Sequence, residues 1–91
     1  MTILEQAIAT NGRDLQLVVA IEEFSELIKE ICKNKRGREN RDNIIEEMAD
    51  CYIMLEQLAI IFSVEKDEIG GWLDRKFERL KKRLAERREE C

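Results

Sequence analysis

Two acidic clusters, each set inside a stretch with the pattern of a buried helix, constrain the fold of this chain most. The first spans residues 22–26 and the second residues 46–50. Residues three or four apart share one face of a helix, so Glu23 projects with Glu26, and Glu47 with Asp50. If two such helices pack together, their carboxylates repel and cost roughly several kcal/mol to desolvate. The pattern therefore predicts a compensating cation, most simply a divalent metal.

The composition favours an all-α protein in one domain, residues 1–91. The chain is 44% apolar and 40% charged and contains no proline, a combination typical of helical proteins. Its formal net charge of −4 argues against duplex nucleic acid as the main partner. Its apolar stretches are too short to span a bilayer, and its three cysteines form no paired motif. We therefore expect a soluble, cytoplasmic protein with reduced thiols and no membrane partner.

Apolar periodicity predicts a short N-terminal helix followed by three longer ones. Gly12 ends the first helix, and Asp14 is the expected N-cap of the second. Asp42 or Asn43 caps the third. The expected helices span residues 2–10, 14–33, 42–62 and 67–84, and the charged residues 85–91 are expected to fray.

The second and third predicted helices carry apolar residues on more than one face. A single bundle of 91 residues cannot hide that much apolar surface. We therefore expect an obligate oligomer, either a homodimer or a homotetramer built as a dimer of dimers.

Residues 33–41, here called the basic segment, contain five basic residues in nine and no apolar side chain. This composition predicts a loop, within a connection at residues 33–43. Two interpretations remain open. The loop is either a solvated, mobile connection or a cationic flap over a bound polyphosphate.

A basic row borders the core stripe of the fourth predicted helix. Trp72, Lys76, Arg79 and Arg83 are spaced four, three and four residues apart. In the ordinary interpretation, long stems cover apolar surface while the charged heads stay in water. Lys76 and Arg79 are the best candidates for a different role. Trp72 either packs in a core or interface, or stacks on a nucleotide base.

The four acids favour a hard, all-oxygen metal site. The chain has no histidine and no cysteine pair, which disfavours zinc and largely excludes di-iron bundles built on Glu-x-x-His. Carboxylate oxygens suit Mg²⁺ or Mn²⁺. If the acids meet, at least one of them should have a raised pKa. The competing interpretation is that they form an ordinary solvated helix face.

The spacing of the acids resembles the signature of a known family. Glu22-Glu23-x-x-Glu26, a spacer of 20 residues and Glu47-x-x-Asp50 are similar to the EExxE…ExxD pattern of the MazG-like, all-α nucleotide pyrophosphohydrolases, which are related to the dimeric dUTPases. The flanking Glu26-Leu27 and Glu46-Glu47-Met48-Ala49-Asp50 agree. With the following basic helix, the resemblance extends over roughly residues 15–84.

This resemblance implies an oligomeric, four-helix-bundle-like fold and Mg²⁺-dependent hydrolysis of a nucleoside triphosphate to the monophosphate and pyrophosphate, with Mn²⁺ as a substitute metal. The substrate is expected to be a deoxynucleotide or a damaged nucleotide, which suits a house-cleaning enzyme. Glu22 matches a position that varies within the family, and the resemblance leaves open whether it is the catalytic base or a residue in the outer coordination shell of the metal. Lys76 and Arg79 are expected to offset charge on the leaving pyrophosphate. The implied metal ligands are Glu23, Glu26, Glu47 and Asp50.

A second class of function stays open from the sequence. A non-catalytic helical module that oligomerises through its apolar faces has the same composition and periodicity. Metal-dependent thermal stabilisation separates the two classes, because a site that binds Mg²⁺ only when folded must raise the melting temperature.

Overall fold

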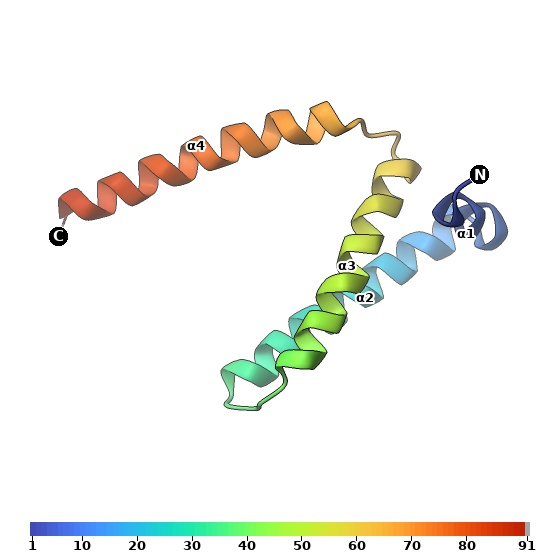
Figure 1. Cartoon of the computed structure of the whole chain (residues 1–91), viewed down its shortest axis with the longest axis horizontal. Helices are drawn as coiled ribbons and strands as arrows, with labels where there is room; N and C mark the ends of the chain where they lie inside the picture. Colours follow the sequence, from blue (N-terminus) through green and yellow to red (C-terminus); the bar gives the residue numbers. More distant parts are fainter. Residues whose placement is uncertain (91) are drawn as a thin grey trace.

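The computed structural model describes residues 1–90, with side chains to Arg88, and Cys91 lies outside the described residues. Within residues 1–90 the chain forms four helices and no strand, so the predicted all-α class is confirmed. Figure 1 shows a hairpin of two helices, with a short helix at its open end and a long helix that leads away from it. The helices are α1 (Ile3–Asn11), α2 (Arg13–Lys35), α3 (Arg41–Ile61) and α4 (Lys66–Glu90).

The ends of α1 follow from local hydrogen bonding. Thr2 and Glu5 form a capping box, in which each side chain accepts the backbone N–H of the other residue. Gly12 ends the helix with a φ of +89°, a conformation that favours glycine, as the sequence predicted. Gly12 also takes the N-cap position of α2, which the sequence had assigned to Asp14.

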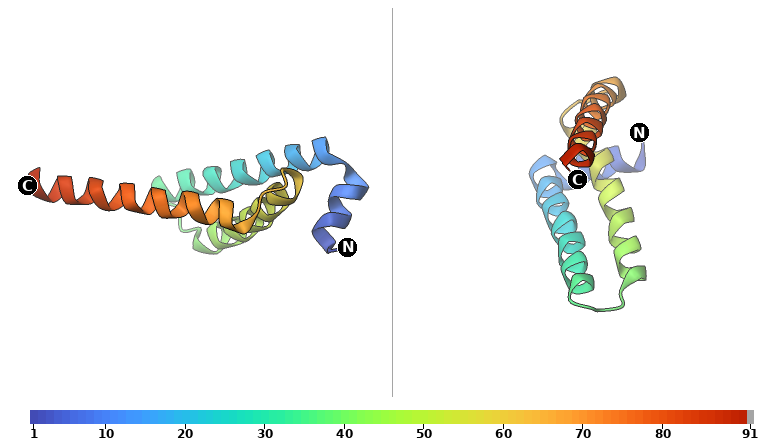
Figure 2. Two further views of the ribbon diagram at one scale, coloured as in Figure 1. Left: turned by 90° about the horizontal axis from the view of Figure 1, so that it is seen from above. Right: turned by 90° about the vertical axis from the view of Figure 1, so that its left-hand side faces the viewer.

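α2 and α3 pack side by side as an antiparallel hairpin, and α1 lies against both of them at its open end (Figures 1 and 2). The buried apolar side chains of the described residues are few: Ala20, Cys51 and Met54. A buried hydrogen bond of 2.7 Å from Gln16 Nε2 to Gln57 Oε1 joins the two helices near the open end. The hairpin core is therefore small and partly polar.

The turn of the hairpin is tighter than the sequence suggested. α2 continues to Lys35, and α3 already begins at Arg41. Asn40 occupies the N-cap position, but its side chain makes no capping hydrogen bond to α3. Its amide instead donates to two oxygens of Glu30, the backbone oxygen at 2.9 Å and the carboxylate oxygen Oε2 at 2.6 Å. The predicted cap at Asp42 or Asn43 is therefore wrong, because Asn40 anchors the start of α3 to α2 instead.

α4 lies apart from the rest of the chain. Among the described residues, no Cα atom of α4 lies within 8 Å of a Cα atom of α1, α2 or α3, and Figure 1 shows it running away from the hairpin. The helix reaches Glu90, so the expected end near Leu84 was too early. Its apolar stripe is exposed: Ile69, Leu73, Phe77, Leu80 and Leu84.

This arrangement is far more open than a compact domain of the same size. The radius of gyration is 17.2 Å, against roughly 12 Å for a compact 91-residue domain. The accessible surface is 7763 Å², about 2,000 Å² more than the size of the chain predicts. None of the helices formed by residues 1–90 has the length and apolar character needed to cross a membrane.

Candidate metal centre

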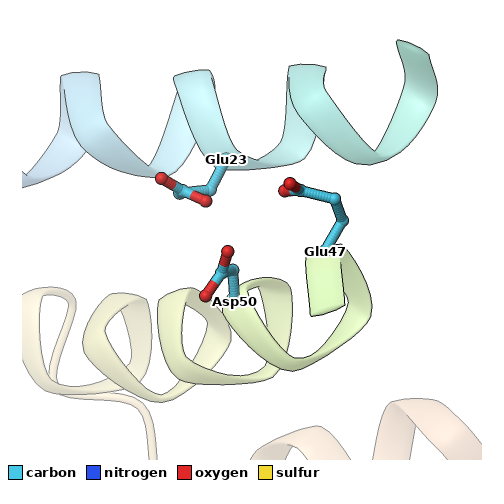
Figure 3. Close-up of side chains that lie close together, drawn as sticks. All are labelled: Glu23, Glu47 and Asp50. Atoms are coloured by element: carbon cyan, nitrogen blue, oxygen red, sulfur yellow. The ribbon is translucent and has the colours of Figure 1, made fainter. Parts of the chain in front are cut away.

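Three carboxylates from two helices converge in the middle of the hairpin. Glu23 extends from α2, and Glu47 and Asp50 extend from α3, one turn apart (Figure 3). One oxygen from each carboxylate lies within 4.8 Å of the other two. All three residues are half-buried. The sequence predicted this meeting, because the antiparallel packing sets the inward acids of the two helices opposite one another.

The local environment opposes full ionisation of this cluster. Burial raises the pKa of Glu23 above its ordinary value, and the neighbouring Asp50, Glu47 and Glu26 raise it further. Burial also raises the pKa of Glu47, followed by the charges of Asp50 and Glu26 among others. The expectation that at least one acid has a raised pKa is thus confirmed. Within the described residues, no cationic side chain forms an ion pair with Glu23, Glu47 or Asp50.

One oxygen of the cluster has no partner at all. Oε2 of Glu47 is buried and accepts no hydrogen bond within the described residues. A buried carboxylate oxygen without a donor is costly, so an unpaired one marks a place for a bound cation or water. Because the donors are all carboxylate oxygens, the group that fits this site is a hard divalent cation such as Mg²⁺ or Mn²⁺.

Cys51 borders the cluster but is not suited to bind the metal. Its thiol points to the backbone oxygen of Glu23, with a distance of 3.7 Å from Sγ to the oxygen. Burial raises the pKa of this thiol, and the adjacent Glu47 and Glu23 raise it further. Cys51 therefore stays a neutral thiol and packs between the helices.

The other two predicted acids, Glu22 and Glu26, are exposed. Glu26 is exposed and lies outside the group of three converging carboxylates, yet it is near enough to raise the pKa of both Glu23 and Glu47. Glu22 is exposed on α2. The structure thus brings together three of the four predicted ligands and leaves Glu26 beside them.

The two predicted basic residues are not at the acidic cluster within one chain. Lys76 and Arg79 are exposed on α4, where they line a shallow hollow with Leu80 and Arg83. Because α4 has no contact with α2 or α3 in the described part of the chain, their roles stay predictions. Trp72 is exposed on the same helix, and the guanidinium of Arg75 lies 4.0 Å from the centre of its ring.

Sequence reasoning missed Glu30, which continues the acidic series along α2. Glu23, Glu26 and Glu30 are spaced three and four residues apart, and this spacing was a visible signal. Glu30 is buried between Asn40 and Lys33, whose Nζ lies 3.3 Å from its carboxylate. The hydrogen bond from Asn40 lowers the pKa of Glu30, so this acid stays ionised, and its charge is balanced by Lys33.

A scan against protein-family models, a search of curated proteins and a search of solved structures each found no match to this chain. The function is therefore inferred from the site itself. Its central features are the convergence of Glu23, Glu47 and Asp50 and the unpaired oxygen of Glu47.

Proposed function

We propose that this chain is a metal-dependent hydrolase that converts a nucleoside triphosphate to the monophosphate and pyrophosphate, in the manner of the MazG-like enzymes that its acidic motifs resemble. The observation that carries the proposal is the convergence of Glu23, Glu47 and Asp50 between two helices. Its support is chemical: the pKa of two of these acids is raised, and one oxygen of Glu47 is buried without a partner.

In this proposal Glu23, Glu47 and Asp50 hold Mg²⁺ or Mn²⁺, and Glu26 supplies a further ligand from the edge. The bound metal supplies positive charge that neutralises phosphate oxygens and orients the polyphosphate. A cation held there would also offset the burial and the neighbouring charges that raise the pKa of Glu23 and Glu47. Metal binding and substrate binding are therefore expected to be coupled.

Water is the proposed nucleophile. The described residues offer Ser25 as the hydroxyl inside a motif, but its Oγ donates to the backbone oxygen of Ile21 at 2.8 Å. The chain also contains no histidine that could activate it. The exposed carboxylate of Glu22, on α2 beside Glu23, is the proposed acceptor of the proton of the attacking water. A new oxygen–phosphorus bond forms, the bridge between the α and β phosphates breaks, and pyrophosphate leaves.

The proposed enzyme is an oligomer. Exposed apolar residues follow helical spacing on α2 and α3 as well as on α4, and the excess surface of about 2,000 Å² is comparable with what a stable subunit interface buries. Assembly also gives α4 of one chain a route to the acidic cluster of another, where Lys76 and Arg79 can offset charge on the leaving pyrophosphate. On the hairpin the exposed apolar residues include Ile21, Ile28, Met48, Tyr52, Leu55 and Phe62.

The test of this function is a screen of canonical and damaged nucleoside triphosphates with the full-length protein. We expect at least one of them to give monophosphate and intact pyrophosphate in equal amounts. A chelator should abolish the activity, and Mg²⁺ or Mn²⁺ should restore it. A parallel Glu47→Gln preparation controls for contaminating phosphatases. Release of inorganic phosphate with a diphosphate left behind means cleavage at a different bond and contradicts the proposal.

The second candidate function is a non-catalytic helical module that binds other chains through its apolar faces. The observation in its favour is the exposed apolar stripe of α4, which has no partner within the described chain. The two candidates differ in their response to metal. A protein with no nucleotide turnover and no increase in melting temperature on addition of Mg²⁺ is the module and not the enzyme.

A further inference from the structure

The basic segment, residues 33–41, concentrates positive charge at the turn of the hairpin. Its five cations and one carboxylate give a formal charge of +4, in a chain whose net charge is −4. The acidic cluster lies between the same two helices (Figure 3), farther along them from the turn. The hairpin therefore carries positive charge at its turn and negative charge in its middle. The cations are Lys33, Lys35, Arg36, Arg38 and Arg41.

The backbone that carries these cations is held by a network of hydrogen bonds. Asn40 is buried, and its side chain donates to two oxygens of Glu30. Asn34 Nδ2 donates to the backbone oxygen of Arg38 at 3.4 Å and to Oδ1 of Asn40 at 3.2 Å. Gly37 has a φ of +98° and closes the turn with a backbone hydrogen bond of 2.9 Å to Asn34. The segment therefore forms a hydrogen-bonded turn between α2 and α3.

Most of these cations have no counter-ion in the described part of the chain. Lys33 pairs with Glu30 at 3.3 Å, whereas Arg36 and Arg38 form no ion pair with a described residue. Lys33, Arg36 and Arg38 line one shallow hollow. Two of the three cationic side chains around this hollow, Arg36 and Arg38, thus have charges that no described residue balances, an arrangement that suits an anion with several oxygens.

The acidic cluster limits which anion fits. Arg41 precedes Glu47 by six residues on α3, which is roughly 9 Å along the helix axis. Glu30 lies between the two charged regions along α2, four residues after Glu26 and three before Lys33. A ligand that contacts both regions needs an anionic part near the turn and a cation at the acids. A polyphosphate complexed with a divalent metal has this combination of charges.

We propose that the basic segment is a binding site for the phosphate groups of a polyphosphate, with Arg36 and Arg38 as its principal contacts. On the proposed function, the occupant is the terminal phosphates of the nucleoside triphosphate substrate, or the pyrophosphate product. This deepens the proposed function by giving the turn a role in substrate recognition. The anion site itself depends only on the turn and its cations.

The experiment is calorimetric titration of pyrophosphate into the full-length protein in the presence of a chelator, so that the acidic cluster holds no metal. We expect binding that weakens as salt rises. The double variant Arg36→Gln and Arg38→Gln should raise Kd at least about tenfold, because one charge-assisted contact commonly contributes about that factor. The matched control, Arg87→Gln with Arg88→Gln on the exposed end of α4, removes the same charge and should change Kd less than about twofold.

A further variant tests the role of the ordered turn. Asn40→Ala keeps every cation but removes the hydrogen bonds to Glu30, so Kd for pyrophosphate should rise while the net charge is unchanged. Circular dichroism checks that the helices persist. Mn²⁺ binding at the acidic cluster should be the same in the Arg36→Gln and Arg38→Gln variant as in the wild type, because these arginines are not metal ligands.

Two results overturn the inference. One is unchanged pyrophosphate binding when Arg36 and Arg38 are both replaced, and the other is an equal loss in the Arg87 and Arg88 control, which indicates non-specific charge. These outcomes are separable from failure of the proposed function. Pyrophosphate binding that depends on Arg36 and Arg38 in a protein without nucleotide turnover keeps the anion site and removes the enzyme. Turnover with unchanged pyrophosphate binding does the reverse.

Discussion

The α2–α3 hairpin and α4 differ in where their apolar surfaces find a partner. In the hairpin, Ala20, Cys51 and Met54 are buried between the two helices. In α4, Phe77 is 58% exposed and the rest of the apolar stripe is similarly open, because no other helix of the described chain covers it. Amphipathic periodicity thus indicates which face of a helix is apolar, but not whether the same chain covers that face.

The hairpin also differs from α4 in what its inward face contains. Glu23, Glu47 and Asp50 lie where a purely structural hairpin places apolar side chains. Like charges in this position oppose folding, whereas the apolar stripe of α4 favours association. Metal binding and assembly are therefore expected to stabilise different parts of one molecule, and each can be disrupted separately.

The largest expected effect comes from the hairpin. Glu47→Gln removes one ligand and should lower nucleotide hydrolysis more than about a hundredfold, beyond the 10–100-fold loss typical of outer-shell changes at metal sites. Without metal the variant should melt at or above the wild-type temperature, because repulsion within the cluster is relieved. The matched control is Glu56→Gln, an exposed acid on the same helix, which should keep full activity. A Glu47→Gln protein that unfolds shows instead that this carboxylate is a structural partner.

The next effect tests α4. Phe77→Asp places a charge in the middle of the exposed stripe and should weaken assembly by about thirtyfold or more, since a central interface residue commonly contributes about 2 kcal/mol or more. Multi-angle light scattering over a dilution series measures this. Ala85→Asp adds the same charge to the same helix away from the stripe and should leave assembly intact. A wild-type chain that stays monomeric and well folded at micromolar concentration contradicts the assignment of α4 as an interface.

A smaller effect is expected at the open end of the hairpin. Gln57→Ala removes the acceptor of the buried 2.7 Å hydrogen bond from Gln16. An amide left unpaired at a buried site costs about 1–3 kcal/mol of unfolding free energy. Gln6→Ala, which changes an exposed glutamine of α1, should cost less than about 0.5 kcal/mol. Urea denaturation measures the loss of unfolding free energy. An equal loss in Gln57→Ala and Gln6→Ala means that the hydrogen bond between Gln16 and Gln57 does not stabilise the hairpin.

The smallest effect is a dependence of stability on pH without metal. The pKa of Glu47 is raised above its ordinary value of 4.5 in the folded chain. At a pH between the ordinary and the raised pKa, the folded state therefore binds more protons than the unfolded state. Stability therefore falls as pH rises through this window and stays lower above it. Glu47→Gln removes this titration. The free energy of unfolding of the variant should therefore increase relative to that of the wild type from about pH 4 to pH 7. If the difference in unfolding free energy between the variant and the wild type is constant over this range, folding does not raise the pKa of Glu47.

Much of the hairpin could be predicted from the sequence. Apolar periodicity located all four helices of the described chain, and the glycine at position 12 marked the end of the first. The i, i+3 spacing of the acids predicted the meeting of Glu23, Glu47 and Asp50, since antiparallel packing leaves the inward acids few other positions. Local rules sufficed here because the partner helices are consecutive in the chain.

The remaining features depend on contacts that spacing does not encode. Asn40 anchors the turn through hydrogen bonds to Glu30, ten residues away, and so moves the start of α3 ahead of the expected cap. The separation of α4 from the hairpin leaves Lys76 and Arg79 far from the predicted site within one chain. The charged residues after Leu84 continue the helix, because polar composition alone does not end a helix of good helix formers.

The most direct test of the central claim, that the acids of the hairpin form a metal site, is a titration of chelator-treated protein with Mn²⁺, followed by electron paramagnetic resonance. The wild type and the Glu56→Gln control should bind Mn²⁺ saturably and release it to excess Mg²⁺, with a matching rise in melting temperature. Glu47→Gln and Asp50→Asn should lose this binding while remaining folded. Absence of saturable binding in the wild type, or equal binding by wild type and Glu47→Gln, contradicts the account.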